Sequence, residues 1–101
     1  MNVANLQLEG LMMAVASINH VLVRKGILTV GDVNTALLKA QSNMTGEDRS
    51  SELSPASRDA INFPLRVLQV CNQCNPEADL PTFSEITRLV ADMKPPYNDQ
   101  V

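Results

Sequence analysis

Apolar residues recur along the first 25 residues of the chain at alternating spacings of four and three. This spacing keeps them on one face of an α-helix, so it predicts an amphipathic helix over about residues 3–25. The helix has a clear end, because Arg24 and Lys25 suit a helix C-terminus and Gly26 follows them. The face that the spacing defines consists of Ala4, Leu8, Leu11, Val15, Ile18 and Leu22.

A second helix is predicted over about residues 30–42. Thr29 and Asp32 resemble a capping box, and apolar residues follow them at helical spacing. Because few residues separate Gly26 from this helix, the first two helices must meet in a tight corner. The polar stretch 43–54 that comes next predicts a mobile loop.

A third helix is predicted over about residues 55–74, because Ser54 is a good N-cap and Pro55 suits the first helical position. Pro64 lies inside this range and removes one backbone hydrogen bond, which predicts a kink or a break near it. The segment is apolar on two faces, which is typical of a helix at the centre of its domain.

Thr82 and Glu85 form a capping box that predicts a fourth helix over about residues 83–93, and two prolines end it. Residues 95–101 are expected to form a flexible tail. Together the four segments predict an all-α fold, a small bundle of about four helices in a single domain over residues 1–101.

The amino-acid composition favours the same fold class. Hydrophobic residues make up 45% of the chain and aromatic residues only 3%, so the core must be built from aliphatic side chains and methionine. Such a core suits packed helices better than sheets, in which aromatic and β-branched pairs stabilise the strands.

The charge distribution argues against two classes of partner. The net charge is −3, and the eight basic residues are scattered instead of forming a cationic surface. Nucleic acids and anionic membranes bind to such surfaces, so neither partner is expected. Glu9 lies inside the N-terminal apolar stretch and no basic segment precedes it, which does not fit a signal peptide. We therefore expect a cytoplasmic protein with reduced thiols.

Cys71 and Cys74 form the only pattern typical of metal or redox chemistry. A redox pair works at a helix N-terminus, whereas this pair lies at the end of a predicted helix, where the helix dipole disfavours a thiolate. Zinc needs four ligands, and His20, the single histidine, lies on another predicted helix and is expected on a solvated face. We expect no metal and no cofactor, and we keep a metal or redox protein using Cys71, Cys74 and His20 as an alternative.

Glu47, Asp48 and Glu52 cluster in the predicted loop and could bind a cation. Their spacing lacks the alternating ligands and the central glycine of a calcium loop, so a solvated run of charge is expected. Nowhere does the chain show a coherent set of nucleophile, base and orienting group. We therefore expect no catalytic residues and no enzyme activity.

The apolar arc of the first helix is wider than packing against one neighbour requires. Met12 lies on the flank of the face defined above, and Met13 lies on the side opposite to it. Either other helices cover the whole arc, or part of it is exposed and marks a partner interface, and the sequence leaves both possibilities open. The candidate interface residues are Leu8, Leu11, Met12, Met13, Val15, Ile18 and Leu22.

The corner from Lys25 to Val33, which includes Gly26-Ile27-Leu28-Thr29, is similar to a turn of short oligomerisation modules and of some helix-turn-helix domains. The similarity covers about nine residues and comes mainly from capping chemistry. In a DNA-binding version the second helix would be the recognition helix, but it offers one cation, Lys39, and also bears Asp32. A DNA-associated regulator is therefore only an alternative.

These observations favour a non-catalytic helical interaction module. We expect it to self-associate through the first helix, as a homodimer, because that helix is long, has a wide apolar arc and belongs to a small chain without a catalytic set. A small adaptor or a subunit of a larger protein complex would use the same surface, and the sequence does not separate the two.

Overall fold

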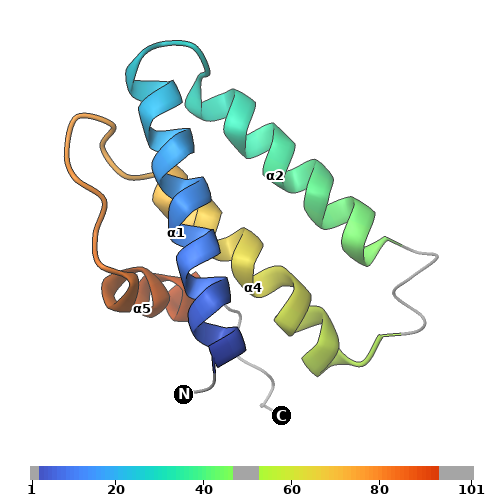
Figure 1. The fold of residues 1–101 in the computed structure, drawn as a ribbon. Coiled ribbons are helices and arrows are strands. Elements are labelled where there is room, and N and C mark those ends of the chain that lie inside the picture. Colours follow the sequence, from blue (N-terminus) through green and yellow to red (C-terminus); the bar gives the residue numbers. More distant parts are fainter. Residues whose placement is uncertain (1–2, 47–52, 94–101) are drawn as a thin grey trace.

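The computed structural model describes residues 3–46 and 53–93, and these residues form four α-helices and no strand (Figure 1). The predicted all-α fold is thus confirmed for the described part of the chain. The second helix ends at Thr45 and the third at Asn72, a little later and a little earlier than expected. The helices are α1 (Val3–Arg24), α2 (Val30–Thr45), α4 (Pro55–Asn72) and α5 (Phe83–Met93).

The predicted loop lies partly outside the described residues, which leave out 47–52. The predicted tail, 95–101, lies wholly outside them. The expected mobility of both stays a prediction. The first residues of the loop prediction, 43–45, continue helix α2 instead.

The end of α1 follows from the left-handed conformation of Gly26, whose φ is 76°. The amide of Ile27 donates to the carbonyl of Leu22 at 3.0 Å, and the amide of Gly26 donates to the carbonyl of Val23 at 3.0 Å. This pair of bonds is a Schellman motif, which satisfies carbonyl groups that the helix itself leaves unpaired. The chain then turns sharply into α2, as the sequence predicts.

The starts of the other helices are fixed by the capping residues identified in the sequence. Thr29 accepts from the Asp32 amide at 2.9 Å, and Asp32 accepts from the Thr29 amide at 3.0 Å, so aspartate completes the box despite its shorter side chain. Ser54 accepts from the amide of Ser57 at 3.1 Å. At the start of α5, Glu85 donates its amide to Thr82 at 3.2 Å and accepts the Thr82 amide at 2.9 Å.

Helix α4 is the centre of the fold, because α1, α2 and α5 all pack against it (Figure 1). This confirms the position predicted from its two apolar faces. The main core lies between α1, α4 and α5, and Val67 and Ile86 are its most completely buried large side chains. Its buried members are Met12, Ala16, Val67, Val70, Cys71, Ile86 and Val90.

Helix α4 continues through Pro64 as one helix from Pro55 to Asn72. The break that we considered beside a kink therefore does not occur. Because proline has no amide hydrogen, the carbonyl four residues earlier, that of Ala60, loses its helical partner. Packing on three neighbouring helices holds α4 together across this defect.

Helix α2 packs on α4 apart from the main core. Its buried residues, Val33 and Leu37, are not part of the cluster shared by the other helices. The side chain of Asn72 donates to the carbonyl of Val30 at 3.0 Å and so joins the end of α4 to the start of α2. Elsewhere on α4, the buried side chain of Asn62 has an oxygen, Oδ1, with no hydrogen-bond partner among the described residues.

Candidate functional site

Helix α1 has two apolar faces, and only one of them is buried. Met12 and Ala16 belong to the main core, and Met13 packs against it. Of the candidate interface residues, Met12 and Met13 therefore stabilise the fold of the single chain. Ala16 is small, which lets α1 approach α4 closely, and only 1% of it is exposed.

The other apolar face is the one that the four-and-three spacing defines, and it faces away from the core. Leu11 is 60% exposed, Ile18 is 59% exposed and Leu8 is 51% exposed. Ala4 is exposed as well, whereas Val15 and Leu22 are half-buried. We call this face the α1 seam, and it consists of Ala4, Leu8, Leu11, Val15, Ile18 and Leu22.

The α1 seam borders a groove of about 320 Å³ between α1 and α2. Val15 belongs to both the seam and the groove, and Asn19 is the other groove residue on α1. The groove arises because α1 and α2 both rest on α4 and have few contacts with each other (Figure 1). Its remaining lining residues are Leu28, Asp32, Val33, Ala36 and Leu37.

Sequence reasoning missed this groove. The sequence shows an apolar stripe on the second helix, and the structure buries Val33 and Leu37 of that stripe. The groove exists because α4 holds α1 and α2 apart. The distance between two helices depends on tertiary packing and is not encoded in a local sequence pattern.

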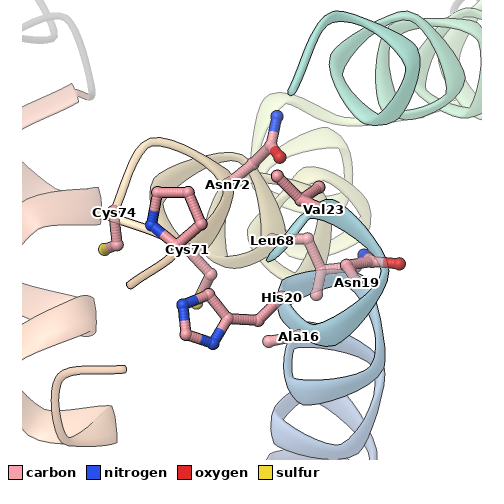
Figure 2. Close-up of a pocket in the computed structure, with 9 residues that line it drawn as sticks. Ala16, Asn19, His20, Val23, Leu68, Cys71, Asn72 and Cys74 are labelled. Atoms are coloured by element: carbon pink, nitrogen blue, oxygen red, sulfur yellow. The ribbon is translucent and has the colours of Figure 1, made fainter. Parts of the chain in front are cut away.

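His20 and the two cysteines are brought together, although His20 lies on α1 whereas Cys71 lies at the end of α4 and Cys74 just after it. All three line a small pocket where α1 meets the end of α4, and the imidazole extends from α1 toward that end (Figure 2). His20 is half-buried, and its Nε2 lies 3.2 Å from the carbonyl oxygen of Asn75. His20 is thus less solvated than expected, because the segment after α4 places the Asn75 carbonyl against its ring.

The environment of the thiols opposes their ionisation. Burial, and secondarily the nearby Cys74, raise the pKa of Cys71 to about 11, and burial also raises the pKa of Cys74. The Cys74 thiol donates to the carbonyl of Val70 at 3.4 Å. Since the thiolate is the form that attacks substrates and binds metals, both cysteines are held in their less reactive state.

No group of three or more His, Cys, Asp or Glu side chains among the described residues could hold a metal ion. The pocket thus gathers the three weak metal candidates without giving them the arrangement of a metal site. The acidic residues Glu47, Asp48 and Glu52 lie outside the described residues, so their expected solvation stays a prediction.

Within the part of the chain that the structure describes, α1 is the one helix long and apolar enough to cross a membrane. Core helices of soluble proteins and signal sequences can be equally long and apolar, so length and composition alone do not make α1 a membrane-spanning helix. The window that meets it is 11% buried, which again shows how much of α1 the fold leaves uncovered.

Comparison of the chain with protein-family models, with curated proteins and with solved structures finds no match in any of the three. The case for a function therefore rests on the surface and the chemistry of the chain itself.

Proposed function

We propose that this chain is a non-catalytic helical interaction module that self-associates through the α1 seam, as a dimer. The observation that carries the proposal is a row of apolar side chains at coiled-coil spacing in which Leu8, Leu11 and Ile18 are more than half exposed. No charged residue interrupts α1 between Gly10 and Val23. Contiguous apolar surfaces of this kind mark protein interfaces.

A second copy is a suitable occupant because a two-fold dimer needs one patch that is complementary to itself. With 22 residues, α1 is about 33 Å long, and a strip about 10 Å wide along it offers about 330 Å² in projection. Stable interfaces bury about 800 Å² per partner, roughly an eighth of the 6676 Å² accessible surface of this chain. The neighbouring groove between α1 and α2 supplies further area, so we place it inside the interface.

The first test is the mass in solution, measured by light scattering behind a sizing column over a dilution series. The chain has a mass of 11.0 kDa, so a dimer has twice that mass, about 22 kDa. We expect the dimer at high concentration and dissociation on dilution.

Two substitutions test whether the α1 seam forms the interface. Leu11→Glu and Ile18→Glu, made together, place charges where the partner would bury them, at a cost of several kcal/mol. About 3 kcal/mol would weaken the dimer roughly 100-fold. Because both side chains are largely exposed in the single chain, its own unfolding free energy should change by no more than about 0.5 kcal/mol for each substitution.

Matched controls separate this effect from a general loss of surface hydrophobicity. Leu6 and Leu38 are 51% and 50% exposed but lie outside both the α1 seam and the groove. Leu6→Glu and Leu38→Glu should leave the dimer intact. A monomer at every concentration would refute self-association, and the seam would then be tested as the docking surface of a small adaptor for another protein.

A further inference from the structure

We propose that the two copies pair antiparallel, with Leu11 of each copy against Val15 of the other. This inference rests on the proposed self-association and adds to it the orientation and the register of the partner. Its starting point is the order of side-chain sizes along the α1 seam, which begins with the smallest residue, Ala4, and ends with a large one, Leu22.

Antiparallel pairing about the middle of the seam places its smallest residue, Ala4, against a large one, Leu22. Three layers result, each repeated by the two-fold symmetry, namely Ala4 with Leu22, Leu8 with Ile18, and Leu11 with Val15. Facing positions that alternate in size fill the space between helices evenly. A parallel pair in register would instead place Ala4 against Ala4 and leave a void at one end.

The heptad positions of the seam argue in the same direction. Leu8, Val15 and Leu22 occupy a positions, and Ala4, Leu11 and Ile18 occupy d positions. Parallel two-stranded coiled coils favour β-branched residues at a and leucine at d. Here two of the three a positions hold leucine, and isoleucine stands at a d position, so the sequence departs from the parallel pattern.

Charge at the end of α1 also opposes a parallel pair. Arg24 and Lys25 close the helix, and parallel copies would bring all four cations to one end of the dimer. Antiparallel copies separate the two basic ends by about the 33 Å length of the helix, well beyond the screening length of about 8 Å at physiological salt. They also align the two helix dipoles in opposite directions.

The same register directs the partner toward the groove. Val15 lines the groove beside Val33 and Ala36 of α2. Leu11 of the other copy, placed against Val15, therefore lies at the mouth of this groove, and symmetry repeats the contact on the other side. This places α2 in the interface and adds to the area that α1 alone supplies.

Cross-linking between engineered cysteines tests the orientation. In the 101-residue chain with Cys71→Ala and Cys74→Ser, one variant carries Leu8→Cys and a second carries Ile18→Cys, and the two are also co-expressed. Both positions are exposed, so the fold should tolerate the changes. Light scattering and circular dichroism on each variant confirm that the dimer and its helices are retained. A short bismaleimide is the probe.

In the antiparallel pair, Leu8 lies opposite Ile18 of the other copy, while the two Leu8 positions are ten residues apart along the axis (18 − 8), about 15 Å. We expect a covalent dimer from the co-expressed pair and little from either variant alone. Ala4→Cys with Leu22→Cys should behave in the same way.

The outcomes separate this inference from the function on which it rests. Cross-linking of the Leu8→Cys variant with itself would show a parallel pair and overturn the inference. A dimer by light scattering that cross-links in neither single nor mixed form would overturn the register, with self-association intact. A monomer by light scattering would overturn both.

Discussion

Asn62 allows the free-energy cost of a buried polar side chain without a hydrogen-bond partner to be measured. Its side chain is only 8% exposed, and Oδ1 has no hydrogen-bond partner among the described residues. A buried polar group left without a partner costs about 1–3 kcal/mol. Leucine has the same number of side-chain heavy atoms and the same branching as asparagine, so Asn62→Leu removes the unpaired oxygen with little change in shape.

The expected gain is worked out from four contributions. Removing the unpaired oxygen contributes about 1–3 kcal/mol, and helix propensity adds roughly 0.5 kcal/mol. Burying two methyl groups adds about 0.8 kcal/mol each at most, and loss of any bond made by the amide nitrogen subtracts about 1 kcal/mol. We therefore expect Asn62→Leu to raise the free energy of unfolding by about 2 kcal/mol.

Urea unfolding followed by circular dichroism measures this change, and thermal unfolding should show a midpoint about 8–16 °C higher for 2 kcal/mol. Asn43→Leu is the matched control, because Asn43 is an exposed asparagine in α2 and gains only the propensity contribution. An unchanged or lower stability of Asn62→Leu, with the helical content retained, would refute the reasoning by showing that the buried oxygen is already satisfied.

Three further predictions concern groups described above. Hydrogen bonds from Thr82 lower the pKa of the Glu85 carboxyl in the folded chain. The ionised carboxylate therefore stabilises the fold above about pH 4.3, and this contribution is lost as pH falls through the lowered pKa. In urea titrations, the stability difference between the natural chain and Glu85→Gln should shrink on going from pH 6 to pH 3. Because the pKa of the Cys71 thiol is raised in the folded chain, its contribution to stability is complete below about pH 8.5 and is lost as pH rises through about 11. Cys71→Ala should therefore weaken the loss of stability at alkaline pH. Iodoacetamide should modify Cys74 before Cys71, because Cys71 is the more deeply buried thiol. Gly26→Ala should lower the free energy of unfolding by about 1–2 kcal/mol, because φ is 76° at this position. Gly10→Ala should raise it by about 0.5–1 kcal/mol, because Gly10 lies inside α1 and has open space for a Cβ atom. Equal effects at the two glycines in urea unfolding would contradict this prediction.

The helix boundaries were predictable because their causes are local. A cap such as Thr29 with Asp32, or Thr82 with Glu85, forms its bonds within one turn, and Gly26 ends α1 through its own backbone conformation. Sequence alone therefore placed all four helices within a few residues. The continuity of α4 across Pro64 was not predictable, because it depends on the helices packed around it.

The candidate site was predictable only in part. The seam was visible from its spacing, but its exposure was not, because α1 carries a second apolar face around Met12 and Ala16. Which face α4 covers is decided by close packing at Ala16, a contact between distant segments. The approach of His20 to Asn75 likewise spans 55 residues, and nothing near either residue indicates it.

The buried side chains form two separate packing regions, and this division determines which helices can unfold locally in the native protein. The buried side chains of α2 lie outside the cluster that α1, α4 and α5 share, and α4 takes part in both. In native-state hydrogen exchange, α2 can then separate as a unit without disturbing the rest, whereas amides in the middle of α4 exchange only when both parts come apart. The slowest-exchanging amides of the protein should thus mark α4, the helix with a proline in its middle.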